Sequence, residues 1–258
     1  MSDLQTTTEG SALLVEITRP KQANALSTDL LQELEAAMDA AEADRGIRAV
    51  VLTGSSSVFS AGADLREAVA SFDVMDALRY VRLLQRATTT IESMLKPVVA
   101  AIRGHCMTGG LELVLACDRR VAGTSAHFAI TSSRIGSVAG MGGTQRLPRV
   151  VGAAAAKDIL YTGRDVAADE ALAIGLVDEL HADEDVISVA FEWAGTVADR
   201  APLSVSLTKM AVNTGVDLDL ASALSVELGL AVLAAGTADR AEGIQAFLEK
   251  RPPSFSGS

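Results

Sequence analysis

The amino-acid sequence predicts an α/β protein in which a sheet-based core is followed by a helical carboxyl-terminal region. Apolar runs typical of buried strands alternate with segments of helical period up to about residue 180, and helical patterns alone follow. At 258 residues the chain can bury a sizeable core, and its 49% hydrophobic but 3% aromatic composition predicts a core of Ala, Val, Leu and Ile. We therefore expect a core over residues 1–200 and a helical region over residues 201–258, with the boundary near Arg200-Ala201-Pro202.

The first sixty residues predict a strand, a helix and a second strand. Ala12–Thr18 has the composition of a strand, and Pro20 then indicates a loop, because proline cannot donate a hydrogen bond within a sheet. Ser27 or Thr28 can cap a helix whose apolar positions recur every three or four residues, at Leu30, Leu34, Met38 and Ala41. Ile47–Thr53 is expected to be a buried strand, followed by a small, polar, mobile loop over residues 54–60.

The middle of the chain continues the alternation. A long amphipathic helix is expected over Asp73–Met94, with its core-facing side formed by Leu78, Val81, Leu84, Ile91 and Leu95. Short apolar runs predict strands at residues 97–103, 119–122 and 127–130, and Ser132–Gly143 is a glycine-rich loop. The helical stretches that follow cover residues 153–161, 169–173, 183–199, 203–213, 218–235 and 238–250, and the tail from Arg251 is expected to be loose.

Composition excludes several classes of function. The chain has 33 acidic and 22 basic residues, a formal charge of −11, which disfavours a nucleic-acid surface. Two cysteines are too few for a disulfide framework, and the three histidines form no metal-binding pattern. The polar segment Met1–Gly10 has no apolar signal core, and no run approaches the roughly 20 apolar residues of a membrane span. We expect a cytoplasmic protein with neither metal nor membrane partner.

One stretch, Gly104–Asp118, carries the strongest chemical signal. It follows an apolar strand, and its glycines let the backbone approach a bound group closely. From Gly109 the pattern becomes helical, and the first amides of a helix have no partners within it, so they can hold developing negative charge. Glu112 lies about one turn after Gly109 on the same face. This pattern indicates proton transfer or water activation beside a polarised carbonyl group.

Four fragments in the same order carry a resemblance to a known family. They are the loop Arg19–Leu26, the segment Phe59–Leu65, the segment Gly109–Leu113 with Cys117-Asp118, and the loop Gly140–Leu147. Together they resemble the crotonase superfamily, the enoyl-CoA hydratase/isomerase family, over nearly the whole chain. The resemblance implies a spiral of ββα units with a helical carboxyl-terminal trimerisation region, as a homotrimer or a dimer of trimers. It also implies an acyl-CoA thioester substrate, with coenzyme A entering as part of that substrate and no separate cofactor.

The resemblance also assigns roles to individual residues. The backbone amides of Ala63 and Gly109 correspond to the two donors that stabilise an enolate-type oxyanion, and Glu112 falls on the first catalytic glutamate. Ser132 falls on the second catalytic position. Asp64 also has a simpler role as a cap for the helix that follows it. Residues that correspond to substrate or coenzyme A contacts, in some members from a neighbouring subunit at the carboxyl terminus, are Lys21, Ala61, Asp64, Leu65, Gly110, Gly136, Phe247 and Lys250.

Ser132 is a departure from the pattern, because hydratases of this family carry two glutamates and a serine hydroxyl cannot serve as a carboxylate acid or base near neutral pH. Three explanations are open. Glu112 alone hydrates a 2-enoyl-CoA to a 3-hydroxyacyl-CoA while Ser132 holds the water, or Glu67 or Asp64 supplies a second carboxylate. Alternatively, the chain runs another one-base acyl-CoA reaction, such as isomerisation, decarboxylation or C–C hydrolysis. A non-catalytic acyl-CoA-binding protein of the same fold is the alternative from a different class.

Overall fold

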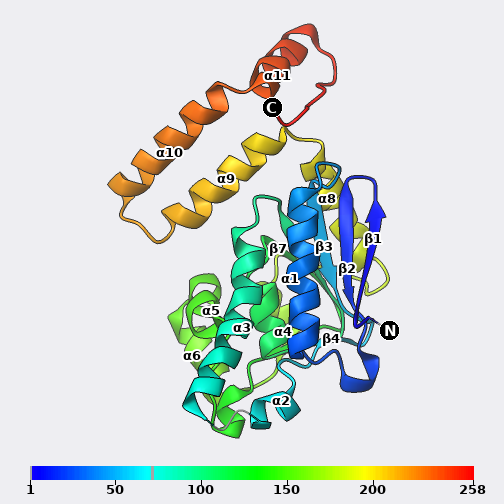
Figure 1. The fold of residues 1–258 in the computed structure, drawn as a ribbon, viewed down its shortest axis with the longest axis vertical. Coiled ribbons are helices and arrows are strands. Elements are labelled where there is room, and N and C mark those ends of the chain that lie inside the picture. Colours follow the sequence, from blue (N-terminus) through cyan, green and yellow to red (C-terminus); the bar gives the residue numbers. More distant parts are fainter. Residues whose placement is uncertain (1, 71–72) are drawn as a thin grey trace.

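The computed structural model describes residues 2–70 and 73–258 and contains a large and a small β-sheet surrounded by helices (Figure 1). The large sheet is parallel except at its first pair of strands, where β1 runs antiparallel to β2. Its strands, in spatial order, are β1 (Leu4–Glu9), β2 (Ala12–Ile17), β3 (Ala49–Thr53), β5 (Val98–Ile102), β7 (Arg119–Gly123) and β10 (Glu179–His181). The small sheet contains β4 (Val58–Ser60), β6 (His105–Met107), β8 (His127–Ala129) and β9 (Val166–Ala167).

Successive pairs of strands divide between the two sheets. β3, β5 and β7 lie in the large sheet, and β4, β6 and β8, which follow each of them directly, lie in the small sheet. Helices then connect one pair to the next: α2 (Leu65–Ala70) and α3 (Val74–Ser93) follow β4, and α4 (Gly109–Val114) follows β6. This repetition is the spiral of ββα units that the family resemblance implies.

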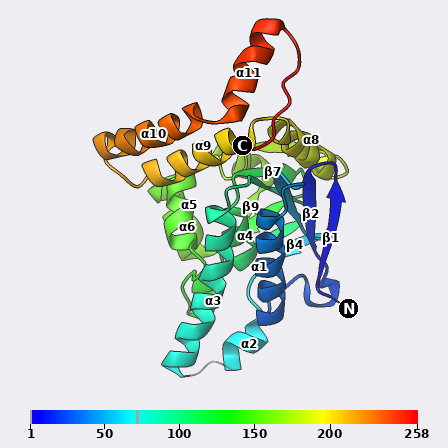
Figure 2. The same cartoon turned by 45° about the horizontal axis from the view of Figure 1, so that its top comes forward.

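Helices cover both faces of the large sheet (Figures 1 and 2). Because side chains alternate along a strand, Val50 and Leu52 face the core shared with α1 (Thr28–Ala43) and α3, whereas Val51 faces α8 (Val186–Ala198). Helix α1 confirms its sequence prediction: the amide of Leu30 donates to the Ser27 hydroxyl, and the apolar stripe is buried. The remaining helices of the core are η1 (Pro20–Gln22), η2 (Ser132–Ile135), α5 (Gly143–Val151), α6 (Ala153–Thr162) and α7 (Ala168–Ala173).

The carboxyl-terminal region consists of α9 (Pro202–Gly215), α10 (Leu220–Ala235) and α11 (Ala238–Glu249). Helices α9 and α10 form an antiparallel pair whose connecting turn projects away from the body of the molecule, and α11 follows at the opposite end of the pair, where α9 begins (Figures 1 and 2). Lys209 anchors α9 to the core: its ammonium group is 2.7 Å from an Asp118 carboxylate oxygen, which also accepts the amide of Val98. Asp118 therefore joins the end of the α4 segment to both a strand and this region.

In the described residues, no single helix is both long and apolar enough to span a membrane, although α10 and α11 together pass that length and composition test with a 71° bend between them.

Several expectations about local structure are wrong. Leu78 and Leu95 do not face the core, since 38% and 41% of their surfaces are exposed. The buried stripe of α3 runs through Leu84 and Ile91; Leu78 lies nearer the end of α3 that extends beyond the core, and Leu95 follows the last turn (Figure 2). The segment 54–60 is not a plain loop, because it contains β4 with Phe59 fully buried, and the loop expected over residues 132–143 contains η2 and leads directly into α5.

The tail is also ordered. The amides of Ser256 and Gly257 donate to the two carboxylate oxygens of Asp239, at 2.7 and 2.8 Å, and Arg48 donates to the carbonyl oxygen of Phe255 at 2.9 Å. Asp239 is only 2% exposed. These bonds fold the tail back between α11 and the core, because a buried carboxylate requires donors.

Candidate active site

The first candidate oxyanion segment, residues 61–64, is attached to the loop that precedes α1. The amide of Leu26 donates to the carbonyl oxygen of Gly62 at 2.8 Å, and the amide of Asp64 donates to the carbonyl oxygen of Leu26 at 3.0 Å. This is a parallel bridge between Leu26 and Ala63, so the amide of Ala63 points to the opposite side. That amide donates to no residue in the described part of the chain.

Asn24 holds this loop in place, a role that the sequence analysis did not assign. Its side-chain oxygen accepts the amide of Arg19 at 2.8 Å, and its side-chain nitrogen donates to the carbonyl oxygen of Val58 at 2.9 Å. Asn24 is fully buried and has a φ of 53°, a conformation that asparagine tolerates better than most residues. An asparagine in a short loop after proline is too common a pattern to have revealed this role.

The second segment is the turn from β6 into α4. The amide of Thr108 donates to the carbonyl oxygen of Ala129 at 2.6 Å, and its hydroxyl lies 3.0 Å from that of Thr131. Thr108 has a φ of 46° and a ψ of −109°, a conformation rare for a β-branched residue, and Gly109 then begins α4. As the first residue of the helix, Gly109 has no acceptor for its amide within α4.

The two segments approach each other closely at Gly109, where a side chain would crowd both the backbone and a neighbouring side chain. A Cβ atom at this position would lie 3.2 Å from the amide nitrogen of Ala63 and 2.9 Å from the sulfur of Met141. A Cβ atom on Gly62 would likewise lie 3.0 Å from the amide nitrogen of Gly109. Two amides without acceptors in the described residues therefore lie side by side, as the resemblance implies for Ala63 and Gly109.

Glu112 lies one turn along α4 from these amides and is only 2% exposed. Its Oε1 accepts the backbone amides of Met141 and Gly143, each at 2.8 Å, while its Oε2 makes no hydrogen bond to a described residue. Burial raises the pKa of Glu112, and the two amides and the Arg146 guanidinium oppose that rise. The site thus contains a buried, oriented carboxyl group of raised pKa with one oxygen available for proton transfer.

Ser132 begins η2 and is 7% exposed. It follows Thr131, whose side chain contacts Thr108, so η2 is attached beside the amino-terminal end of α4. The carbonyl oxygen of Ser132 accepts the amide of Ser137, and its hydroxyl makes no hydrogen bond in the described part of the chain. Ser132 therefore has a hydroxyl that is free to bind a water molecule.

The two carboxylates considered as substitutes for a second glutamate have structural partners. Asp64 contacts the Arg19 guanidinium at 3.3 Å and accepts the amide of Arg66 at 3.1 Å, which confirms it as a cap for α2. Glu67 accepts both the amide and the hydroxyl of Thr28, at 2.8 and 2.6 Å. Together with burial, these two carboxylates raise the pKa of the Tyr80 phenol to about 12. Asp64 and Glu67 thus hold together the amino-terminal ends of α1 and α2.

The remaining expected contact residues fall into two groups. Ala61, Lys21 and Leu65 are exposed on the segments around the two amides, and Gly136 ends η2 with a φ of 73°. Gly110 packs against Ser60, where a Cβ atom would lie 2.8 Å from the Ser60 carbonyl oxygen. By contrast, Phe247 and Lys250 lie on and after α11, which stands outside the body of the molecule that contains α4, so one chain alone does not bring them to Glu112 (Figures 1 and 2).

The small sheet carries one further polar feature. His105 and His127 lie side by side on the paired strands β6 and β8, with ring centroids 5.5 Å apart, and His127 contacts Asp165 at 2.6 Å. Among residues 2–70 and 73–258, no group of three or more His, Cys, Asp and Glu side chains is arranged to hold a metal ion.

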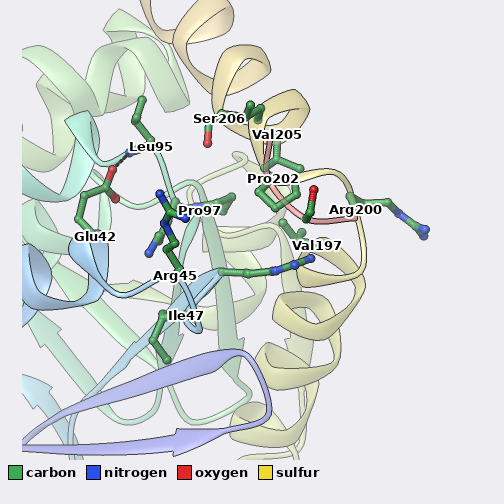
Figure 3. A pocket seen from close by; sticks show the side chains of 15 residues that line it. Glu42, Arg45, Ile47, Leu95, Pro97, Val197, Arg200, Pro202, Val205 and Ser206 are labelled. Atoms are coloured by element: carbon green, nitrogen blue, oxygen red, sulfur yellow. Dashed lines mark hydrogen bonds between the residues drawn. The ribbon is translucent and has the colours of Figure 1, made fainter. Parts of the chain in front are cut away.

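A separate cavity of about 240 Å³ lies at the amino-terminal ends of strands β3 and β5 of the large sheet (Figure 3). Arg45 points into it, Arg200 points away, and Glu42 accepts the amide of Leu95 at its margin. Ala63 and Gly109 follow the opposite, carboxyl-terminal ends of these two strands in the chain. The cavity is thus distinct from the candidate active site.

Fold and site together define an α/β protein in which two backbone amides without acceptors in the described residues lie beside a buried glutamate, and comparison with known proteins gives the family. The family model described as enoyl-CoA hydratase/isomerase matches residues 7–258, and the chain belongs to this family. It is 39% identical to the crotonyl-CoA hydratase of Syntrophomonas wolfei over 96% of this chain and 95% of that protein. It is 36% identical to the 2,3-dehydroadipyl-CoA hydratase of Escherichia coli over the full length of both. The crystal structure of an enoyl-CoA hydratase from Bacillus anthracis matches with a TM-score of 0.95 and 36% identity over all of both chains.

The raised pKa of Glu112 predicts a pH-dependent stability difference between the wild-type protein and Glu112→Gln. A carboxyl group whose pKa is higher in the folded than in the unfolded state stabilises the fold at low pH and loses that contribution as pH rises from about its ordinary value of 4.5 through the raised one. Glutamine does not titrate, so Glu112→Gln should become more stable relative to wild type across this window. Urea unfolding between pH 5 and 8 measures the difference, with the exposed Glu192→Gln as the control for loss of one charge. A difference that stays constant or falls with pH would contradict the raised pKa.

Proposed function

We propose that the protein hydrates a 2-enoyl-CoA to the corresponding 3-hydroxyacyl-CoA, with Glu112 as its one catalytic carboxylate. The observation that carries this proposal is the pair of backbone amides without acceptors beside a buried carboxyl group with a free oxygen. The thioester carbonyl oxygen would lie between the amides of Ala63 and Gly109. Two such donors stabilise the negative charge that develops on this oxygen, each contributing on the order of 3 kcal/mol.

The reaction then requires one proton transfer to and from Glu112. The Oε2 atom takes a proton from a water molecule while the water oxygen bonds to C3 of the enoyl group, and the electron pair of the double bond moves towards the thioester oxygen. The same carboxyl group returns the proton to C2, which restores the thioester and completes the addition of water. Burial raises the pKa of Glu112 and so makes it a stronger base than an exposed carboxylate. In this route the Ser132 hydroxyl would hold the water.

A second candidate is a different one-base reaction on an acyl-CoA, namely isomerisation, decarboxylation or C–C hydrolysis. Ser132 favours it, because the position of the second family glutamate has no carboxylate here. Glu112 and the two amides serve such a reaction equally well. The relatives whose names specify hydration of crotonyl-CoA and 2,3-dehydroadipyl-CoA favour the first candidate.

The assembly that we propose is a homotrimer or a dimer of trimers. Helix α10 has no buried residue, and its exposed leucine and valine side chains, with those of α11, form an apolar surface at Leu220, Leu224, Leu228, Val232, Ile244 and Leu248. Phe247 and Lys250 would then reach the coenzyme A of a neighbouring copy. Cys106 and Cys117 are buried, unpaired thiols, which suits a reducing, cytoplasmic compartment.

Hydration is tested with crotonyl-CoA by the loss of the absorbance of its conjugated thioester. The wild-type protein should turn over, Glu112→Gln should lose about 10²–10⁴-fold in kcat, and Ser132→Ala should lose about fivefold, as expected for one neutral hydrogen bond. Glu192→Gln is the matched surface control. Turnover of a malonyl or β-keto thioester in place of crotonyl-CoA would establish the second candidate. A loss in Asp64→Asn or Glu67→Gln as large as that in Glu112→Gln would contradict the single-carboxylate route.

The oligomer is tested by placing a charge on the apolar surface of α10. Leu228→Glu should break the trimer into monomers, because a carboxylate would have to be buried without a partner. Light scattering coupled to size-exclusion chromatography measures the mass. Leu172→Glu, the same change at an exposed leucine of α7, should keep the wild-type mass. A wild-type protein of monomeric mass would refute the proposed assembly.

A further inference from the structure

The loop that binds Glu112, at residues 141–143, is itself held by further hydrogen bonds. Met141 and Gly143 donate their amides to Glu112, and the carbonyl oxygen of Met141 accepts two further bonds, from the Thr88 hydroxyl at 2.9 Å and from Arg146 at 3.0 Å. Fixing this carbonyl group fixes the backbone of residue 141, and thus the direction of the amides on either side of it. The position of the Glu112 carboxylate therefore depends on groups that do not touch it.

Arg146 has a partner that fixes its own position. Its Nε and Nη2 atoms contact the two carboxylate oxygens of Glu92 at 3.1 and 2.5 Å, a two-point pairing that locks the plane of the guanidinium group. The Arg146 side chain is 15% exposed. A Cβ atom on Gly142 would lie 2.1 Å from Nη1 of Arg146, so the loop passes directly over the guanidinium.

We infer that Arg146, held by Glu92, is a positioning residue that keeps the Glu112 carboxylate charged and oriented through the backbone of Met141. Arg146 comes from α5 and Glu92 from α3, the two helices that pack against α4. The chain of contacts runs from Glu92 to Arg146, to the carbonyl group of Met141, and through its amide to Glu112. This inference rests on the proposed function, because it assigns Glu112 the role of the catalytic base.

Charge supports the same conclusion. Burial raises the pKa of Glu112, and Arg146 is the cation that lowers it. The other titratable groups on elements packed against α4 are the following. On α3, Asp76 pairs with Arg79 and Arg86 pairs with Glu35, and the helix also carries Tyr80 and Arg82. Arg149 of α5 pairs with Asp217 at the surface, β4 has no titratable side chain, and β6 contributes the buried Cys106 thiol and the exposed His105. Glu92 partly neutralises Arg146, so removing Arg146 and removing Glu92 should have opposite effects on Glu112.

The test compares pH profiles of kcat/KM for crotonyl-CoA, because these report ionisations of the free enzyme. Arg146→Met should lose about tenfold in the plateau value of kcat/KM. The acid limb of its profile, where kcat/KM falls as Glu112 is protonated, should move to higher pH. Arg146→Lys, which keeps the charge but not the two-point pairing, should return the acid limb close to that of wild type. Glu92→Gln should move it to lower pH. Arg149→Met, on the same helix but paired at the surface, should follow the wild-type profile.

Unchanged acid limbs in all variants would overturn the inference. So would a shift of Arg146→Met and Glu92→Gln in the same direction, as expected if both merely loosened the loop. If Arg146→Met does not fold, the pH profiles of Arg146→Lys and Glu92→Gln can still be compared with that of the wild-type protein.

A second measurement separates this inference from the proposed function. The carboxyl stretching band of protonated Glu112, obtained as the infrared difference between each protein and its Glu112→Gln form, titrates without any substrate. If wild type fails to hydrate crotonyl-CoA, the proposed function fails, but opposite shifts of this titration in Arg146→Met and Glu92→Gln would still support the positioning role. Coincident titrations in all of the variants would refute it.

Discussion

The close approach of two backbone segments, at Ala63 and Gly109, is the constraint on which the rest of the structure depends. A side chain at position 109 would crowd this contact, since a Cβ atom on Gly109 would lie 3.2 Å from the amide nitrogen of Ala63. The two amides are left without acceptors in the described residues, an arrangement that costs folding free energy unless a ligand supplies one. The surrounding structure must therefore hold both segments rigidly.

The fold provides that rigidity from several directions. Asn24 and the bridge at Leu26 hold the first segment, and the contacts of Thr108 with Ala129 and Thr131 hold the second. Because β3, β5 and β7 are each followed by a strand of the small sheet, consecutive ββα units deliver these segments to the same region. Glu112 is then placed one turn into α4, and the loop after η2 binds its Oε1. The geometry of the candidate site is thus set mainly by backbone hydrogen bonds.

The features that the sequence predicted are those that depend on local pattern. The alternation of strands and helices, the cap of α1 at Ser27, the helix that starts at Gly109 and the position of Glu112 one turn along it all follow from residues close together in the chain. The partners of Glu112 did not follow, because Met141 and Gly143 are about 30 residues away and act through backbone amides that carry no side-chain signal. Strands of three residues such as β4 and β6 are too short to show a period, and the exposed edge strand β1 buries only Leu4. Leu78 and Leu95 follow the helical period of α3, yet they lie where the core ends, which no local pattern reveals.

The central claim, that the amides of Ala63 and Gly109 hold the thioester oxygen, is tested most directly by a crystal structure of the protein with butyryl-CoA, a saturated acyl-CoA that cannot be hydrated. The account predicts the thioester oxygen at roughly 2.7–3.1 Å from both amide nitrogens, with Oε2 of Glu112 facing the C2 and C3 atoms of the acyl chain. A thioester oxygen bound away from either amide, or an acyl chain that leaves Glu112 uncontacted, would contradict it.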